Sequence, residues 1–386
     1  MKNTISLAEL SIGSKGSYGI AASAVPYSDE LYTYLRITDI RDDGTLNLQD
    51  LKSVDDGKAS EYLLKPNDIV FARTGASTGR NYFYDGTDGE FVYAGFLIKF
   101  SIDESKVNPK YIKYYCQSKQ YKDWINSFNT GSTRGNINAQ TLGKMPIPMI
   151  SRKCQDNLVS VLSSIDNKIK QNNEINKNLE QQAKAIYSHI FIDNCSSEWF
   201  GGTLSDIAVI TMGQSPKGDT YNEEGVGTVF YQGRAEFGPR FPTRRLFTTD
   251  PKRMAQENDV LMSVRAPVGD LNIANEPCCI GRGLGAIHSK DNHQSFVLYT
   301  VFAIDQQLDV FNGEGTVFGS INRDSLNSMP ITIPDNESMD QFEKLVAPMD
   351  AIIRNNHDEN CRLQAIRDSL LPKLMSGELD VSDISL

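Results

Sequence analysis

The sequence lacks the signals that most membrane-bound or secreted chains carry. No run of about 18 apolar residues occurs, and no apolar segment follows a basic start, so neither a membrane span nor a signal peptide is expected. The six cysteines show no CxxC spacing and include an adjacent pair, which favours free thiols over disulfides or a zinc site. These absences predict a cytoplasmic protein.

Signatures of catalysis are missing as well. We find no Walker lysine loop, no serine elbow of the hydrolase type and no methyltransferase loop of the Asn/Asp-Pro-Pro-aromatic type. The four histidines show no zinc-binding pair at helical spacing. Residues 281–285, Gly-Arg-Gly-Leu-Gly, have the wrong spacing for a dinucleotide site and read as a turn or bulge. The sequence therefore predicts a protein without catalytic residues, metal or cofactor.

Positive charge is scarce for a nucleic-acid binder, because the net charge is −10. Its distribution is uneven. Lys and Arg balance Asp and Glu over residues 1–150, whereas residues 335–386 hold 11 acidic against 5 basic side chains. Arginines gather between residues 234 and 282 and could form a local basic surface. Since non-specific affinity comes from neutralised phosphates, we expect weak DNA binding without a more basic partner.

What the sequence does contain is a second copy of part of itself. Tyr111–Ile190 can be laid without gaps on Ser295–Leu374 at a constant offset of 184. The matched residues include Tyr115 with Tyr299, Gly131 with Gly315, Gly135 with Gly319, Asn138 with Asn322, Met145-Pro146-Ile147 with Met329-Pro330-Ile331, and Asp166 with Asp350. A duplication of this kind implies two copies of one unit related by an approximate two-fold, which suits a two-fold object such as duplex DNA.

Composition divides the chain into four segments. Residues 1–150 and 193–334 mix short β-branched and aromatic runs with turn signals, which predicts two α+β domains. Residues 151–192 and 335–386 predict long helices, the second followed by a tail. In the first domain, strands are expected over Tyr32–Ile40, Ile69–Arg73 and Phe91–Phe100, and a helix capped by Asn108 is expected to continue through Trp124.

The two helical segments carry an apolar stripe at heptad spacing. We expect these residues to pack helix against helix: Leu158, Ile165, Asn172, Leu179, Ile186, Phe342, Met349, Asn356, Leu363 and Leu370. The second set equals the first plus 184, and an asparagine inside an apolar seam fixes register. An antiparallel coiled coil is preferred, since an internal two-fold requires it. The alternative is that each helix packs on its own domain.

Glycine-rich stretches with arginine and hydroxyl residues recur in both halves. Residues 73–80 match 264–270, and residues 130–136 match 315–320. Each alone is typical of a turn, but recurrence at matched positions favours loops that bind phosphates or base edges. The predicted DNA-binding residues are Arg73, Ser77, Arg80, Arg134, Arg234, Arg240, Arg244, Arg245, Arg265 and Arg282.

Several motifs together resemble a known family. They are the Leu-Leu-Pro-Lys-Leu-Met-Ser-Gly-Glu-Leu run at 370–379, Asn-Asp-Ile/Val at 67–69 and 258–260, Met-Pro-Ile before each helix, and the doubled domain-helix order. Over its whole length the chain resembles the DNA specificity subunit of a type I restriction-modification system, a host-defence complex. The resemblance implies that residues 1–150 and 193–334 are target-recognition domains, each reading half of a split site in double-stranded DNA.

The resemblance also implies partners. The helical segments would set the unread spacer and bind methyltransferase subunits, two in number, which bring S-adenosylmethionine and the base chemistry. Restriction subunits with ATP-driven translocation would join them in some complexes. Two other classes stay open on the residues alone: a coiled-coil adaptor that binds no DNA, and a DNA methyltransferase or nuclease acting by itself.

Overall fold

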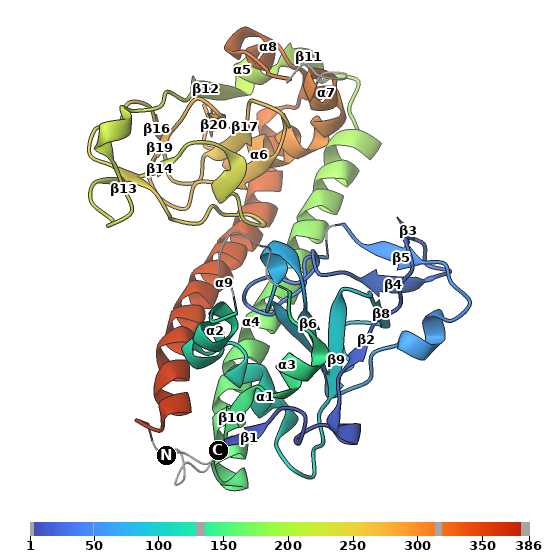
Figure 1. The fold of residues 1–386 in the computed structure, drawn as a ribbon. Coiled ribbons are helices and arrows are strands. Elements are labelled where there is room, and N and C mark those ends of the chain that lie inside the picture. The colour runs from blue at the N-terminus through green and yellow to red at the C-terminus, as the bar shows by residue number, and fades with distance from the viewer. Residues whose placement is uncertain (1–3, 49, 129–135, 313–318, 380–386) are drawn as a thin grey trace. The chain divides into compact units, whose positions relative to one another are not determined.

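The computed structural model describes residues 4–48, 50–128, 136–312 and 319–379. The chain divides into two compact units, Met1–Lys168 with Arg362–Leu386 and Ile169–Cys361. Two long helices, α4 (Arg152–Tyr187) and α9 (Asn336–Ser376), contribute residues to both units (Figure 1). Each unit therefore contains a globular domain together with part of each long helix.

The domain of unit 1 is built on two four-stranded sheets. One has the order β2-β9-β6-β7 and is antiparallel, and the other has the order β3-β5-β4-β8 with β4 and β8 parallel. A short pair, β1 with β10, precedes α4. The strands are β1 Thr4–Ser6, β2 Ser17–Tyr18, β3 Ala24–Pro26, β4 Tyr32–Leu35, β5 Lys52–Val54, β6 Asp68–Ala72, β7 Asn81–Tyr84, β8 Phe91–Tyr93, β9 Leu97–Ser101 and β10 Pro146–Pro148.

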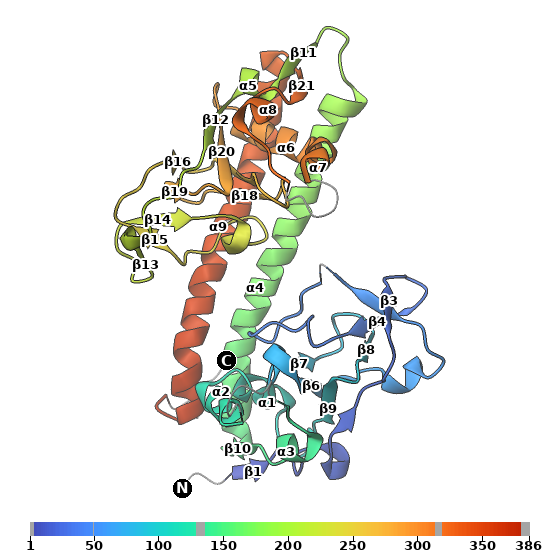
Figure 2. The ribbon, with the colours of Figure 1, turned by 45° about the horizontal axis from the view of Figure 1, so that its top comes forward.

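Three short helices of unit 1 connect this domain to the long ones: α1 (Pro109–Tyr115), α2 (Lys119–Asn126) and α3 (Ala139–Gly143). The Asn108 side chain caps α1 by accepting a hydrogen bond from the Lys110 amide at 3.0 Å, and proline follows at the first helical position. Tyr111 and Tyr114 are buried in one apolar core with Leu158 of α4 and Leu374 of α9. Figure 2 shows α1 against α4 in this unit.

Unit 2 repeats the plan. Its sheets have the orders β12-β20-β17-β18 and β13-β15-β14-β19-β16, and β14 runs parallel to β19 as β4 does to β8. The elements are β11 Phe200–Thr203, α5 Leu204–Ile207, β12 Ala208–Met212, β13 Tyr221–Asn222, β14 Thr228–Tyr231, β15 Phe247–Thr248, β16 Met254–Ala255, β17 Val260–Ser263, β18 Leu271–Ile273, β19 Cys278–Ile280, β20 Leu284–Ser289, α6 Gln294–Ala303, α7 Asp305–Asp309, α8 Arg323–Asn327 and β21 Pro330–Ile333.

Three local expectations need correction. The strand expected over Tyr32–Ile40 ends at Leu35, where the Asp39 carboxylate binds the Arg36 amide and turns the chain. Phe91–Phe100 is two strands of different sheets, joined by a turn in which the Leu97 amide bonds to the Ala94 carbonyl. The helix expected to run to Trp124 breaks at Cys116–Ser118, and Ser118 caps α2.

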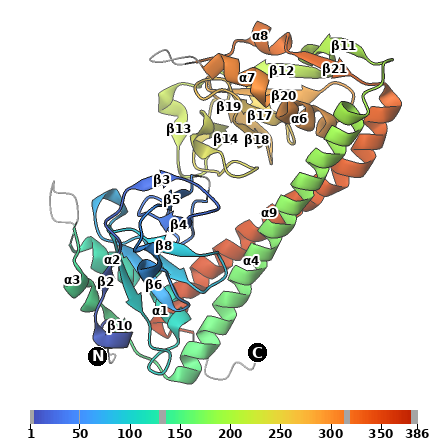
Figure 3. The same ribbon diagram turned by 90° about the vertical axis from the view of Figure 1, so that its right-hand side faces the viewer.

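The long helices run antiparallel in each unit (Figure 3). In unit 2, Asn172 donates to Asn360 at 2.9 Å, and Asn356 donates to Asn176 at 2.8 Å. Adding 184 to the positions of α4 converts one bond into the other, so this part of the seam has a local two-fold. The α+β class with paired antiparallel long helices is confirmed.

All ten residues expected at the helix seam are buried or half-buried. Leu158 and Leu370 join the core of unit 1, whereas Leu179, Ile186, Phe342 and Met349 join that of unit 2. The first helical segment was predicted over residues 151–192. The observed helix ends one residue later, because α4 continues into a π-helical turn at Ser188–Asp193. Within the described ranges, no helix has an apolar stretch sufficient to cross a bilayer.

A half-buried carboxylate binds each domain to the helices. In unit 1, Asp166 of α4 accepts hydrogen bonds from Lys113 at 2.8 Å and Tyr114 at 2.9 Å, and it pairs with Arg367 of α9 at 3.3 Å. Burial alone would raise the pKa of Asp166, but these three donors outweigh it and hold the pKa below its ordinary value.

The repeat-equivalent carboxylate in unit 2 is Asp350 of α9. It accepts from Tyr299 at 3.0 Å and from Arg240 at 2.5 Å, and Arg240 also pairs with Glu180 of α4 at 3.1 Å. Burial raises the pKa of Asp350. Arg240 opposes this rise but does not cancel it, because its single guanidinium also serves Glu180. The two units thus use the same carboxylate position with different cations.

Candidate nucleic-acid interface

The two units present equivalent strand starts. Asn67 and Asn258 adopt left-handed backbone conformations, with φ of 72° and 71°, which asparagine tolerates better than most residues. The next residues are buried aspartates that cap the turn: Asp68 accepts from the Lys65 amide at 2.8 Å, and Asp259 from the Gln256 amide at 2.7 Å. The Asn-Asp motif therefore fixes the entry into β6 and β17.

The buried aspartates differ in their countercharge. Asp68 pairs with Lys99 at 3.1 Å, whereas Asp259 meets His288 at 2.6 Å. Burial raises the pKa of Asp259, against the hydrogen bonds from Gln256 and His288. His288 is thus explained as a local partner of a structural carboxylate, and among the described residues no group of three or more His, Cys, Asp or Glu could hold a metal.

Residues 73–80 and 264–270 each meet the described end of the second glycine-rich stretch in their unit, while residues 130–135 and 315–318 of those stretches lie outside the described residues. In unit 1, the Ile137 backbone amide donates to the Arg73 carbonyl at 2.9 Å, and Thr74 forms an isolated antiparallel β-bridge with Asn136. In unit 2, the Ile321 backbone amide donates to the Val264 carbonyl at 3.1 Å, and Arg265 forms an isolated antiparallel β-bridge with Ser320. Arg134 lies outside the described residues.

A β-turn completes each assembly. In unit 1, the backbone amide of Arg73 donates a hydrogen bond to the Phe96 carbonyl at 3.0 Å, within the turn 94–97. In unit 2, the backbone amide of Val264 donates to the Gly283 carbonyl at 2.9 Å, within the turn 281–284. We call residues 73–80, 94–97 and 136–138 the first loop edge, and residues 264–270, 281–284 and 319–322 the second loop edge. Each edge gathers exposed side chains from three separate segments onto one end of a sheet.

On the first loop edge, Arg73 is half-buried and its guanidinium lies 5.0 Å from the ring centre of Tyr18. Its Nε is buried without a hydrogen-bond partner among the described residues. Ser77 is half-buried at the end of the 3-10 turn Gly75–Ser77. Arg80 is bound to Asp42 at 2.7 Å and to the Ile40 carbonyl at 3.3 Å. Arg80 is therefore paired with a carboxylate, whereas Arg73 is half-buried near an aromatic ring and pairs with no carboxylate among the described residues.

On the second loop edge, Arg265 and Arg282 are both exposed. Among the residues described, no carboxylate is paired with either side chain. Three other exposed arginines that the sequence singled out are held by acids: Arg234 by Asp270, Arg244 by Glu276, and Arg245 by Glu236 at 2.5 Å and Glu223 at 3.2 Å.

Arg240 does not belong to a DNA-facing surface. Its side chain is only 7% exposed and binds Asp350, Glu180 and Tyr299, so it stabilises the contact between domain and helices. The sequence suggested a DNA contact because Arg240 stands among other arginines. Burial of a side chain depends on the tertiary fold, which that local pattern does not contain. Arg240 is accordingly left out of the interface proposed below.

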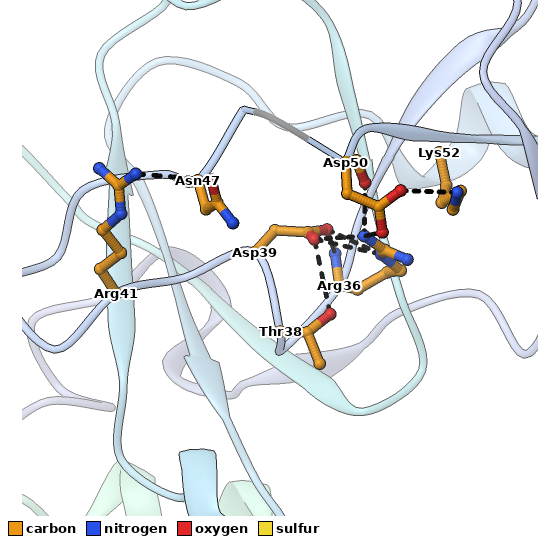
Figure 4. Close-up of polar contacts among 7 residues, drawn as sticks. All are labelled: Arg36, Thr38, Asp39, Arg41, Asn47, Asp50 and Lys52. Atoms are coloured by element: carbon orange, nitrogen blue, oxygen red, sulfur yellow. Dashed lines mark hydrogen bonds and ion pairs between the residues drawn. The ribbon is translucent and has the colours of Figure 1, made fainter. Parts of the chain in front are cut away.

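Sequence reasoning also missed two features. One is a charged cluster after β4 in which Arg36 bonds to Asp39 at 2.6 Å and contacts Asp50, while Lys52 pairs with Asp50 at 2.7 Å (Figure 4). Its charges are balanced internally, and the bond from Lys52 holds the pKa of Asp50 below its ordinary value. The other is Phe96, 58% exposed, which the single-strand reading of 91–100 concealed.

Comparison with known proteins gives the family. The model described as "Type I restriction modification DNA specificity domain" matches residues 20–181 and again residues 196–364. The putative type I restriction enzyme MjaX specificity subunit of Methanocaldococcus jannaschii is 29% identical over 357 residues, covering 86% of this chain and 83% of that protein.

Two further comparisons agree. The type I restriction enzyme HindI specificity subunit of Haemophilus influenzae is 20% identical over 423 residues, covering 86% of this chain and 90% of that protein. A crystal structure of the type I restriction-modification S subunit from M. genitalium shares the fold, with a TM-score of 0.59 at 17% identity over 97% of this chain and 96% of that one. The resemblance is confirmed, and the chain belongs to the type I restriction-modification specificity family as a non-catalytic specificity subunit with two recognition domains.

Proposed function

We propose that this chain reads a bipartite double-stranded DNA target with two domains while partner subunits perform the chemistry. The observation that carries the proposal is the pair of loop edges, built from equivalent segments by equivalent backbone bonds in both units. We assign the first reading domain to residues 1–150 and the second to residues 193–334. A protein that reads chromosomal and incoming DNA is expected in the cytoplasm.

The electrostatics of the edges suit a reader that depends on a partner. Most exposed arginines near the edges are already bound to carboxylates, so few are free to neutralise phosphates. Phosphate contacts supply most non-specific affinity. We therefore expect specific binding to require methyltransferase subunits, which add positive charge and clamp the duplex.

A stripe on α9 supports docking of those subunits. Leu345 and Ile352, both of unit 2, are 56% and 45% exposed, and they lie seven residues apart, which places them on one helix face. Exposed apolar residues aligned in this way are typical of protein interfaces. We propose that two methyltransferase subunits bind the long helices, and that restriction subunits join through them.

Mobility-shift assays test the DNA-reading proposal. The chain with its methyltransferase subunits should shift a duplex carrying the target, and scrambling either half-site should weaken that complex at least tenfold. The chain alone should bind weakly. A complex that assembles but shows no sequence preference would favour the adaptor function, and methylation by the purified chain alone would establish a stand-alone enzyme.

A second experiment addresses docking. Leu345→Glu with Ile352→Glu should weaken binding of the methyltransferase subunit by about tenfold or more, because two apolar contacts are replaced by charge. Gln364→Glu, an exposed position on the same helix, is the matched control and should leave binding unchanged. Helix content by circular dichroism should be equal in both variants, and undiminished binding by the double variant would count against this stripe.

The helices also make a prediction about the spacer. Inserting one heptad into both α4 and α9 should lengthen the unread spacer by about three base pairs, since seven residues rise ~10.5 Å and a base pair rises ~3.4 Å. Mapping methylated positions in cells that carry the insertion measures the spacer. Active complexes with the original spacing would show that the helices do not set it.

A further inference from the structure

The two loop edges carry different side chains at equivalent positions. The register places Ala72 opposite Leu97 in unit 1 and Ser263 opposite Leu284 in unit 2. Beyond those pairs, Arg73 and Phe96 of the first edge correspond to Val264 and Gly283 of the second. Likewise, Thr74 and Gly95 correspond to Arg265 and Arg282. The equivalence rests on shared backbone bonds, so the side chains can be compared directly.

The second edge presents two arginines on a rigid base. Val264, next to Arg265, is only 3% exposed. The hydrogen bond from its backbone amide to the Gly283 carbonyl fixes the turn that carries Arg282. Gly283 leaves no room for a side chain, because an added Cβ would lie 2.9 Å from the Gln232 carbonyl oxygen. Two exposed guanidiniums on adjoining segments, without carboxylate partners among the described residues, are suited to bidentate bonding with guanine O6 and N7.

The first edge presents an aromatic ring on the matching turn, one residue after the position equivalent to Arg282. Phe96 occupies the tip of the turn and is 58% exposed, whereas Arg73 is half-buried with its guanidinium near the Tyr18 ring. Gly95 cannot carry a larger residue without a shift, since an added Cβ would lie 3.1 Å from the Ile20 carbonyl oxygen. In the major groove, an apolar side chain of this kind discriminates through the 5-methyl group of thymine.

We infer that the two domains read half-sites of different chemistry: Arg265 and Arg282 bond to guanine in one half-site, and Phe96 contacts a thymine methyl group in the other. This inference rests on the proposed DNA-reading function and names the bases on which its specificity depends. The repeated scaffold thereby supplies the same loop edge in each domain, and the side chains exposed on that edge set the base.

Base analogues provide the test, with the chain in complex with its methyltransferase subunits. Selection from a randomised duplex library first defines the two half-sites. Each guanine is then replaced by 7-deazaguanine, which lacks the N7 acceptor, and each thymine by uracil, which lacks the methyl group. For the wild-type complex, we expect about tenfold weaker binding for one 7-deazaguanine and about fourfold for one uracil, the size expected for one buried methyl group.

Variants assign each effect to a residue. Arg265→Ala with Arg282→Ala should abolish the sensitivity to 7-deazaguanine, and Phe96→Ala should abolish the sensitivity to uracil. Arg244→Ala and Tyr27→Ala are the matched controls, because Arg244 is exposed but paired with Glu276, and Tyr27 is exposed on the first domain but belongs to none of the segments of the first loop edge. Both controls should retain the wild-type pattern.

The outcomes separate this inference from the function on which it rests. Sequence-specific binding that is insensitive to both analogues, or sensitivity that survives the edge variants, overturns the assignment of bases while DNA reading stands. No enrichment of any sequence by the assembled complex overturns the DNA-reading function and the inference with it.

Discussion

The two units bind their domains to the long helices through the same repeated aspartate, but they neutralise it differently. In unit 1, Asp166 meets two cations, Lys113 and Arg367. In unit 2, the single guanidinium of Arg240 serves Asp350 and Glu180. The duplication preserved the position of the carboxylate and left its countercharge free to change. The units should therefore differ in their response to loss of a cation and to pH.

The largest expected effect is the loss of the shared cation. Arg240→Met leaves two carboxylates buried without their guanidinium and should destabilise unit 2 by about 3–5 kcal/mol. Arg367→Met in unit 1 should cost less, because Lys113 stays 2.8 Å from Asp166. Hydrogen exchange of α6 and α1 peptides measures the two units separately, and equal losses would show that Lys113 does not compensate for the loss of Arg367.

The next effect concerns pH. The pKa of Asp166 lies below its ordinary value of 3.8, so its contribution is complete above 3.8 and is lost as pH falls through the folded pKa. Asp166→Asn should destabilise by about 2–3 kcal/mol at pH 7 and progressively less below pH 4.

Asp350 should respond with the opposite sign. Its folded pKa is raised above 3.8, so the wild-type protein loses stability as pH rises through that folded value. An asparagine cannot ionise, so the penalty of Asp350→Asn should shrink as pH rises, whereas that of Asp166→Asn grows. Urea unfolding followed at several pH values measures both slopes. Parallel slopes would contradict the difference between the units.

A smaller effect is expected at the helix seam. Asn172 is fully buried and donates to Asn360 and Glu359, whereas the equivalent Asn356 is half-buried and donates to Asn176. Asn172→Ala should cost about 1–3 kcal/mol because buried polar partners are left unpaired. Asn356→Ala should cost less. Denaturant titration compares the two, and a reversed order would mean that burial does not decide the cost.

The smallest effect concerns the first loop edge. Asp42→Asn removes the exposed partner of Arg80 and should change the unfolding midpoint very little, since exposed ion pairs contribute little to stability. It should free Arg80 for a phosphate and steepen the salt dependence of DNA binding by the complex by about one unit of slope. Arg80→Ala is the control and should not steepen it.

Local patterns predicted part of this structure from the sequence. The heptad stripe identified both long helices because helix periodicity is a property of neighbouring residues. The constant offset of 184 identified which residues are equivalent, and the seam bonds between asparagines follow that offset. By contrast, the Ala-Gly-Phe turn at 94–96 lacks the usual Asn, Asp or Pro signals, so Phe96 was placed inside a strand.

The candidate site was less accessible to sequence reasoning. Residues 73–80 and 136–138 meet through backbone bonds across some sixty positions of chain, which no local pattern encodes. Arg240 and Arg265 have similar sequence surroundings, yet one is buried between carboxylates and the other is exposed. Whether an arginine is available to DNA depends on what the fold places beside it, and only the structure supplies that information.

The reciprocal asparagine bonds also constrain how such a chain can change over generations. Because Asn172 faces Asn360 while Asn356 faces Asn176, an insertion or deletion confined to one helix would shift polar residues opposite apolar ones on one side of that crossing. Lineages that alter helix length should therefore carry matching insertions or deletions in both helices. The two halves of the gene should change length together even where their reading surfaces diverge in sequence.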